Sequence, residues 1–223
     1  MPDIIYKRLN CHYSDVGTGK SIVFLHGFLE EKSMWKEVSK GFEKTHRVIC
    51  VDLLGHGKTG NLGYVHSMED QAHMLYFLLN HLGVKKSIFI GHSMGGYVGL
   101  CFAELYKDRV SGLCLMNSTA RADDSEKRIN RDRGIAVVKK NHQAFIRMAI
   151  PNLFSQENQS VYADTIEQIT HDSLQMSQQG IIASLEGMKI RVDRSHLLEQ
   201  SDFPVLMVIG KKDPALNLSL IHI

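Results

Sequence analysis

The stretch at residues 88–100, IFIGHSMGGYVGL, decides the fold of this chain. It joins an apolar run, typical of a buried strand, to a helix-like run rich in small residues. A G-x-S-x-G pattern stands at the junction and consists of Gly91, His92, Ser93, Met94 and Gly95. Glycines two positions before and after the serine let strand and helix pack closely while a strained turn projects the hydroxyl above the sheet. The pattern therefore predicts a nucleophilic Ser93 at a helix N-terminus, where developing negative charge is stabilised.

Similar apolar runs recur along the chain and alternate with helix-like runs. The apolar runs cover residues 21–27, 46–52, 86–92, 110–117 and 203–210. The helix-like runs between them cover residues 34–44, 68–83 and 94–108. Continuous apolar strands alternating with helices predict an α/β fold, with a mostly parallel sheet flanked by helices. The first 20 residues predict an antiparallel pair of strands with a glycine-rich turn at Gly17 and Gly19.

The alternation stops after the fourth of these runs. Residues 119–198 are polar and helix-like, and Pro151 should end the first of their helices near Ile150. We expect a helical lid inserted between two strands, over the carboxyl ends of the sheet. The predicted organisation is therefore a first core part (1–118), a lid (119–198), a second and incomplete core part (199–217) and a tail (218–223).

Composition excludes several classes of function. The 223 residues are 43% hydrophobic and 22% charged, with a net charge of +2, so no basic surface indicates nucleic acid. No apolar run is long enough to span a bilayer, and the first residues do not resemble a signal peptide. Four widely spaced cysteines, at positions 11, 50, 101 and 114, favour free thiols in a reducing cytoplasm. Neither a metal nor an organic cofactor is expected, and the sequence leaves the oligomeric state open.

A second motif, His26-Gly27-Phe28, follows the first buried strand. With both motifs, the chain resembles the α/β-hydrolase superfamily, in particular its serine-nucleophile, esterase-like members, from Ile22 to about Asp213. The resemblance implies that the backbone N–H groups of Phe28 and Met94 form the oxyanion hole. It also implies that His26 shapes the loop and that Gly27, Gly91, His92 and Gly95 support the turn.

Two further matches follow from the same resemblance. The turn Asp52-x-x-Gly55-x-Gly57 holds a loop beside the pocket and has no catalytic role. Asp213, after the last apolar run, takes the place of the triad acid and would accept the Nδ1–H of the catalytic histidine. Asp123 and Asp124 follow another strand and are alternative acids; otherwise both are expected to be solvated helix caps.

The histidine that should follow the acid is missing from its expected place. Only ten residues follow Asp213, and His222 lies too close to it for an intervening helix and strand. His142, His171 and His196 lie in the lid, where we expect exposed positions. The last six residues, LSLIHI, resemble the translation of a sequencing adapter, so we expect a truncated chain that lacks its last strand and helix. An apolar strand would then form an unpaired edge, and the chain should fold poorly and turn over little substrate.

The predicted function is that of a serine hydrolase that cleaves a carboxylic ester or thioester of a small acyl substrate through an acyl-enzyme. Carbon–carbon bond hydrolases and lyases of the menaquinone-pathway type resemble the same motifs and stay as alternatives. A non-catalytic binding protein is a further alternative, although such proteins often lose the nucleophile. Arginines of the lid could hold a substrate carboxylate if they point into the pocket: Arg121, Arg128, Arg131 and Arg147.

Overall fold

A computed structural model describes residues 3–213 of the chain. Seven strands form one sheet in the order β1-β2-β4-β3-β5-β6-β7. Their bounds are β1 Asp3–Tyr6, β2 Leu9–Val16, β3 Ser21–Leu25, β4 Arg47–Val51, β5 Ser87–His92, β6 Val110–Met116 and β7 Val205–Val208. The pairings from β4 through β7 are all parallel, and β1 and β2 join antiparallel. The α/β fold and the five strands β3 to β7 agree with the prediction from sequence.

Two hydrophobic clusters cover the two faces of the sheet. On β3, Val23 and Leu25 belong to the larger cluster, whereas Ile22 and Phe24 belong to the smaller one. The alternation follows from the two-residue period of a strand, which turns successive side chains to opposite faces. Because both faces are covered, every residue of β3 is buried, as its continuous apolar sequence predicts.

The turn of the N-terminal hairpin differs from the prediction. β1 and β2 do pair antiparallel, but the turn between them is Lys7-Arg8, which adopts φ values of 47° and 72°. Gly17, with φ of 82°, instead lies in the link from β2 to β3. A Cβ on Gly17 would lie 2.3 Å from the carbonyl oxygen of His46. The glycine is therefore needed for close approach to the neighbouring segment, and two ordinary residues form the hairpin turn.

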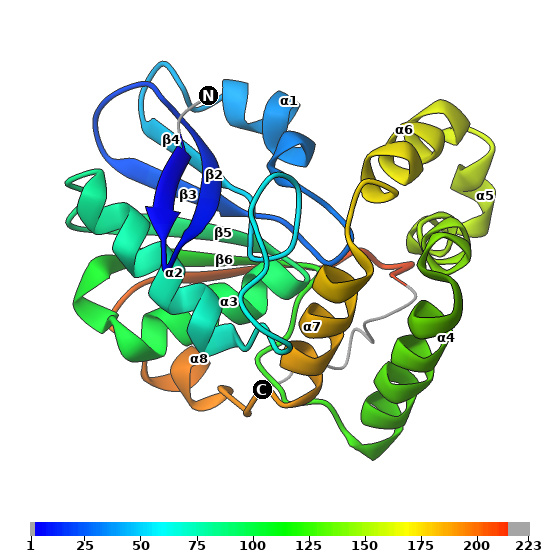
Figure 1. Ribbon diagram of the computed structural model, residues 1–223. Coiled ribbons are helices and arrows are strands. Elements are labelled where there is room, and N and C mark those ends of the chain that lie inside the picture. Colours follow the sequence, from blue (N-terminus) through cyan, green and yellow to red (C-terminus); the bar gives the residue numbers. More distant parts are fainter. Residues whose placement is uncertain (1–2, 214–223) are drawn as a thin grey trace.

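Helices occupy both faces of the sheet and the space beyond its carboxyl edge (Figure 1). Their bounds are α1 Lys36–Lys40, α2 Met68–His81, α3 Met94–Leu105, α4 Ser125–Ala149, α5 Gln156–Gln159, α6 Ala163–Ser173, α7 Gln178–Lys189 and α8 His196–Gln200. The helix expected over residues 34–44 is shorter than predicted, because a 3-10 turn (Lys32–Trp35) precedes α1. Gly83, just beyond α2, has the positive φ of 66° that is typical of a helix end.

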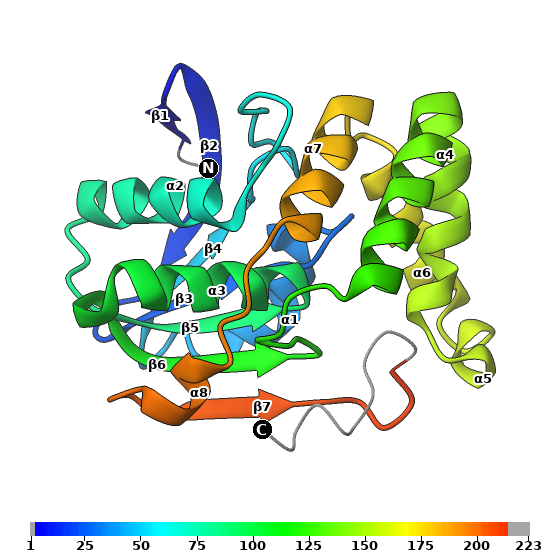
Figure 2. The same cartoon turned by 90° about the horizontal axis from the view of Figure 1, so that it is seen from below.

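The polar segment after β6 folds as helices. Figure 2 shows α4, α6 and α7 beyond the carboxyl ends of β6 and β7, while α8 lies beside α3. α4 ends at Ala149, directly before Ile150 and Pro151, as the position of the proline predicts. α4 is interrupted at Asn141, whose φ of −159° and ψ of 93° are not helical. The backbone N–H of Arg194 donates to the carbonyl oxygen of Ala120 at 2.8 Å, so the segment leaves the core next to where it enters.

The sheet face that carries the smaller cluster is incompletely covered toward β7. Ile88, Ile90 and Met116 on this face are only half-buried, and Leu206 and Val208 of β7 are 59% and 43% exposed. Among the described residues, β7 is also the edge of the sheet. No helix of residues 3–213 is both long enough and apolar enough to cross a membrane.

Candidate active site

Ser93 occupies a strained turn between β5 and α3. Its φ of 49° and ψ of −113° are unusual for any residue with a side chain. Its N–H donates to the carbonyl oxygen of Met116 at 2.9 Å, and the hydroxyl of Ser118 donates to its carbonyl oxygen at 2.7 Å. Because β6 and the segment after it hold both polar groups of its backbone, the turn keeps this conformation and Ser93 stays at the N-terminus of α3.

The glycines of the motif are required by close backbone approach. A Cβ on Gly91 would lie 2.4 Å from the carbonyl oxygen of Gly95, and a Cβ on Gly95 would lie 2.2 Å from that of Leu25. Gly96 is equally restricted, since its Cβ would lie 2.2 Å from the hydroxyl oxygen of Ser118. These distances are far below van der Waals contact, so the three glycines let α3 start directly against the strands.

His26 is fixed in the loop after β3. Its ring is fully buried, its Nδ1 donates to the carbonyl oxygen of Gly27 at 2.8 Å, and its Nε2 accepts the N–H of Leu53 at 2.9 Å. Burial lowers the pKa of His26. With both ring nitrogens engaged and the ring neutral, His26 joins the loops after β3 and β4 and has no nitrogen left to act as a base.

Two backbone N–H groups near Ser93 are without an acceptor in the described part of the chain. Met94 is the first residue of α3, so its N–H has no partner within the helix. The N–H of Phe28 is likewise without a hydrogen bond among residues 3–213. These are the two donors that the sequence assigns to an oxyanion hole, and that assignment stays a prediction.

Glu30 joins the loop after β3 to the residue that precedes the nucleophile. Its Oε2 accepts the Gly27 N–H at 2.6 Å and lies 2.8 Å from Nδ1 of His92. Burial lowers the pKa of His92, but the hydrogen bond and charge of Glu30, together with the charge of Asp213, outweigh it and raise the pKa above its ordinary value. His92 is therefore more readily protonated than a free histidine and bears a carboxylate partner beside Ser93.

Asp213 follows β7 and reaches the same region as Ser93. Its N–H donates to the carbonyl oxygen of Gly210 at 3.1 Å, which forms a turn. Asn117, at the end of β6, holds this turn because its Oδ1 accepts the Gly210 N–H at 2.8 Å. Asn117 has a φ of 43°, in the left-handed region that asparagine tolerates better than most residues. Asn117 thus connects the serine region with the Asp213 turn.

Ser93 lies where two cavities meet. The larger has a volume of about 530 Å³ and the smaller about 370 Å³, and both are lined by Ser93 and Asn117. The larger is bordered by His92, Asp213 and side chains of α6 and its surroundings, mainly Leu153, Phe154, Ile169 and Met176. The smaller lies between Phe28, Tyr97 and Phe145 and the first turns of α4. Volumes of this size suit a small organic molecule.

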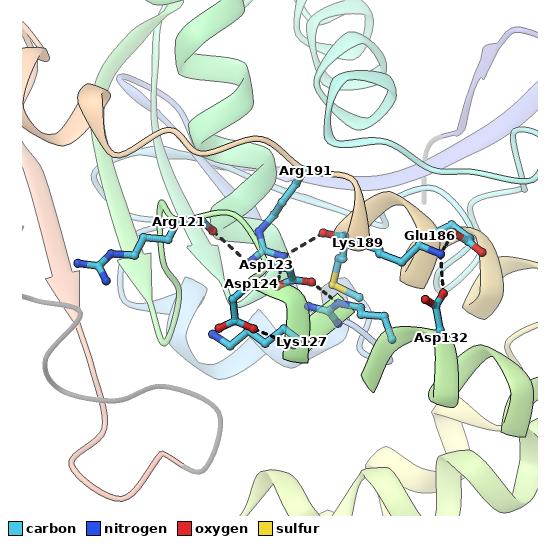
Figure 3. Close-up of polar contacts among 10 residues, drawn as sticks. Arg121, Asp123, Asp124, Lys127, Asp132, Glu186, Lys189 and Arg191 are labelled. Carbon is cyan, nitrogen blue, oxygen red and sulfur yellow. Dashed lines mark hydrogen bonds and ion pairs between the residues drawn. The ribbon is translucent and has the colours of Figure 1, made fainter. Parts of the chain in front are cut away.

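Asp123 is the centre of a buried ion cluster at the base of the helical segment (Figure 3). Its two carboxylate oxygens lie 2.8 Å from Nε of Arg131 and 2.6 Å from a terminal nitrogen of Arg191. Arg191 is itself buried and stacks over the ring of Tyr97 at 4.0 Å. Burial raises the pKa of Asp123, but the two arginines outweigh it and hold the pKa below its ordinary value.

The alternative acids therefore have different roles from each other. Asp124 is an exposed cap whose carboxylate accepts the Lys127 N–H at 2.8 Å, as predicted. The expectation of a solvated cap is wrong for Asp123, because two arginines compensate its burial. Among the four arginines proposed from sequence, Arg131 alone lines either of the two cavities at Ser93, and Arg121 points away from the cluster in Figure 3. Arg191 and Glu30 lacked a sequence signal, since their partners are distant in the chain.

No histidine of residues 3–213 forms a hydrogen bond with the Ser93 hydroxyl. The lid histidines are exposed or half-buried helix residues: His142, His171 and His196. His222 and the predicted tail lie outside the described residues. The base of the predicted triad is therefore not assigned within the described part of the chain.

The aspartate-glycine turn after β4 is structural. The carboxylate of Asp52 accepts the N–H groups of Lys32 and Lys58 at 2.8 and 3.1 Å and pairs with Lys32 Nζ at 3.1 Å. Gly57, with φ of 51°, passes so close that a Cβ at this position would lie 2.5 Å from this carboxylate.

The four cysteines are free thiols, as expected. Cys114 is half-buried and the other three are buried, and burial raises the pKa of all four thiols.

Known proteins resemble this chain in both sequence and structure. A Bacillus subtilis protein named provisionally as 2-succinyl-6-hydroxy-2,4-cyclohexadiene-1-carboxylate synthase is 32% identical, over 87% of this chain and 74% of its own. The 3-oxoadipate enol-lactonase 2 of Acinetobacter baylyi is 24% identical, over 89% and 73%. A thermophilic esterase from Thermogutta terrifontis, solved with malate bound, superposes with a TM-score of 0.86 at 35% identity and covers 91% of this chain and 75% of its own.

The family comparison agrees with these relatives. Residues 20–220 match the family described as the alpha/beta hydrolase fold, which includes every element from β3 to β7. The chain therefore shares its fold with proteins named as an esterase and an enol-lactonase. The chain belongs to the alpha/beta hydrolase fold family and is a hydrolase enzyme.

Proposed function

We propose that this protein cleaves a carboxylic ester or thioester of a small acyl substrate, with Ser93 as the nucleophile. The observation that carries the proposal is the position of Ser93, which stands in a strained turn at the junction of two cavities. The unpaired N–H groups of Phe28 and Met94 lie on the two segments beside it. Asp213 borders the larger cavity together with Ser93.

In the proposed reaction, the Ser93 oxygen attacks the carbonyl carbon and its proton passes to a histidine supplied from outside residues 3–213. The Phe28 and Met94 N–H groups stabilise the oxyanion, a contribution of about 3 kcal/mol for each such donor in other enzymes. Collapse of the tetrahedral intermediate releases the alcohol or thiol, which takes the proton back from the histidine. Water then attacks the acyl-enzyme with the same histidine as base and releases the acid.

Asp213 would orient that histidine and stabilise its charged form. The turn at Gly210 and the hydrogen bond that the Gly210 N–H donates to Asn117 support this role, because they hold the Asp213 segment at the carboxyl end of the sheet. The relatives named as an esterase and an enol-lactonase act on carbonyl–oxygen bonds and favour this class of reaction. We further propose that the protein is cytoplasmic.

A second candidate is a lyase or a carbon–carbon bond hydrolase on the same motifs. The Bacillus subtilis relative, named as a synthase of a cyclohexadiene carboxylate, favours this candidate. A non-catalytic binding role is less favoured, because such a protein would not need a serine held in a strained turn beside two unpaired donors.

Hydrolysis of p-nitrophenyl acetate by the 223-residue chain tests the proposal. Because the described residues place no histidine on Ser93, the expected rate is low, and added imidazole should raise it by acting as an external base. Ser93→Ala should abolish both the basal and the imidazole-dependent rates beyond the background of imidazole alone. In a form of the protein that contains the triad histidine, a fluorophosphonate probe should label Ser93 and leave Ser93→Ala unlabelled. Equal hydrolysis by both chains, corrected for that background, would contradict the nucleophilic role.

A further inference from the structure

The two cavities that meet at Ser93 differ in charge. The larger is lined by four carboxylates, those of Glu30, Glu31, Asp172 and Asp213. No lysine or arginine of the described chain lines it, and its one basic group, His92, is held by Glu30. The remaining lining is largely apolar. The larger cavity therefore accepts an apolar or neutral group and repels an anion.

The smaller cavity has the opposite character. Lys127 and Arg131 line it from one face of α4, four residues and about one helical turn apart. The one carboxylate that lines it, Asp123, is shared between Arg131 and the buried Arg191. Two arginines and a lysine thus surround a single carboxylate, which leaves the cavity positive.

Hydrogen-bond donors remain available in this cavity. Asp123 occupies only Nε of Arg131, and the terminal nitrogens of Arg131 have no partner among residues 3–213. Lys127 Nζ likewise has no ion pair within the described chain, because only its backbone N–H binds Asp124. A guanidinium with both terminal nitrogens free and an ammonium on the same helix face suit a planar carboxylate. Phe28, Tyr97, Phe145 and Leu185 supply apolar and aromatic surface to the same cavity.

We infer that the smaller cavity is a carboxylate-binding subsite, formed by Arg131 and Lys127, and that the substrate is an acidic ester. The inference rests on the proposed ester hydrolysis and specifies its substrate class. The ester bond lies at Ser93, the free carboxylate of the substrate lies in the smaller cavity, and an uncharged, apolar group lies in the larger one. The reverse orientation would place an anion against four carboxylates, so the charge difference between the cavities selects one orientation.

The test uses the Ser93→Ala chain, which binds ligands without turnover. Monomethyl glutarate, an anionic monoester, is compared with the neutral dimethyl glutarate by NMR titration. The monoester should bind about tenfold more tightly, as expected for one charge-assisted carboxylate site in a partly buried cavity. Lys127→Gln should remove most of this preference without loss of folding, since Lys127 Nζ has no protein partner within residues 3–213.

Arg128→Gln is the matched control, because Arg128 is exposed on the same helix and lines neither of the two cavities. This substitution changes the net charge by the same amount as Lys127→Gln. Arg128→Gln should leave the preference for the monoester intact, whereas Arg131→Gln should abolish it. Circular dichroism checks that the Arg131→Gln chain is folded. Equal binding of the two esters, no saturable binding of the monoester, or equal effects of Lys127→Gln and Arg128→Gln would overturn the inference. Hydrolysis of neutral p-nitrophenyl acetate by chains with Ser93 intact reports on the proposed function separately.

Discussion

One carboxylate oxygen of Glu30 lies 2.8 Å from Nδ1 of His92 and also accepts the Gly27 N–H. A single side chain therefore connects the loop that contains Phe28 with the residue that precedes Ser93. The contact fixes the Gly27 peptide next to the proposed oxyanion donor. It also places this glutamate–histidine pair at the wall of the larger cavity.

The Glu30–His92 pair predicts a pH-dependent contribution to stability. The folded pKa of His92 is raised, so this contribution is present below the unfolded value of about 6.5 and is lost as the pH rises through the folded pKa. Glu30→Gln should therefore lower the free energy of unfolding by about 1 kcal/mol more at pH 5.5 than at pH 9. Urea unfolding at the two pH values measures the difference.

Glu31→Gln is the control for this experiment, since Glu31 lines the same cavity but the carboxylates that raise the pKa of His92 are those of Glu30 and Asp213. The other carboxylate that acts on His92, that of Asp213, is unchanged in both variants. A Glu30→Gln chain whose loss of stability is the same at both pH values would refute the coupling.

The strained backbone of Ser93 predicts that glycine is more stable than alanine at this position. Glycine adopts φ of 49° and ψ of −113° without a Cβ clash, so Ser93→Gly should exceed Ser93→Ala in unfolding free energy by about 1 to 2 kcal/mol. Both variants lack the hydroxyl, so the comparison isolates the backbone. At Ser125, the first residue of α4, the alanine variant should instead have the higher unfolding free energy. If alanine were the more stable residue at both positions, the backbone of Ser93 would not be strained.

Close packing of α3 against the sheet predicts that Gly95→Ala is severely destabilising. Its Cβ would lie 2.2 Å from the carbonyl oxygen of Leu25, so the helix must shift, at a cost of more than about 2 kcal/mol. Gly134→Ala in α4 is a suitable control, because its Cβ would lie 3.6 Å from the nearest atom and alanine favours helix. Thermal unfolding should show a large loss for the first variant and a gain for the second; similar midpoints would argue against this packing.

The buried Asp123 predicts a large difference between two adjacent aspartates. Asp123→Asn leaves Arg131 and Arg191 without their counter-ion and should cost about 3 kcal/mol or more. Asp124→Asn should be nearly neutral, since asparagine caps a helix as well as aspartate does. Because the folded pKa of Asp123 is lowered, its contribution is present above about pH 4 and disappears as the pH falls through that pKa. Unfolding at pH 7 and pH 3 measures both effects, and equal losses for the two variants at pH 7 would exclude a buried ion cluster.

The local features of this protein were predictable from sequence. The strands and the serine turn are encoded within short segments, because buried parallel strands are continuously apolar and the turn requires glycines at fixed positions. Pro151 likewise marks the end of α4 without reference to any other part of the chain. The hairpin turn at Lys7 and Arg8 was not predictable in this way, since neither residue is typical of positive φ.

The distant contacts at the site could not be read from sequence. Asp123 and Arg191 are 68 positions apart, and His92 and Glu30 are 62 apart, so no local pattern relates them. Their pairing depends on how the helical segment returns to the core and on how the loop after β3 bends. The charge difference between the cavities arises from the same tertiary arrangement and emerges only when the lining residues are known.

The adjacent ends of the helical segment have a consequence for how such enzymes diversify. Arg194 donates to the Ala120 carbonyl oxygen, and Asp123 binds Arg191, so the segment departs from and rejoins the core at nearly one point. Because its two ends meet, the length of the segment is not set by the distance between β6 and β7. We therefore expect changes in the helices between Ala120 and Arg194 to alter the two cavities that they line while the order of the sheet stays the same.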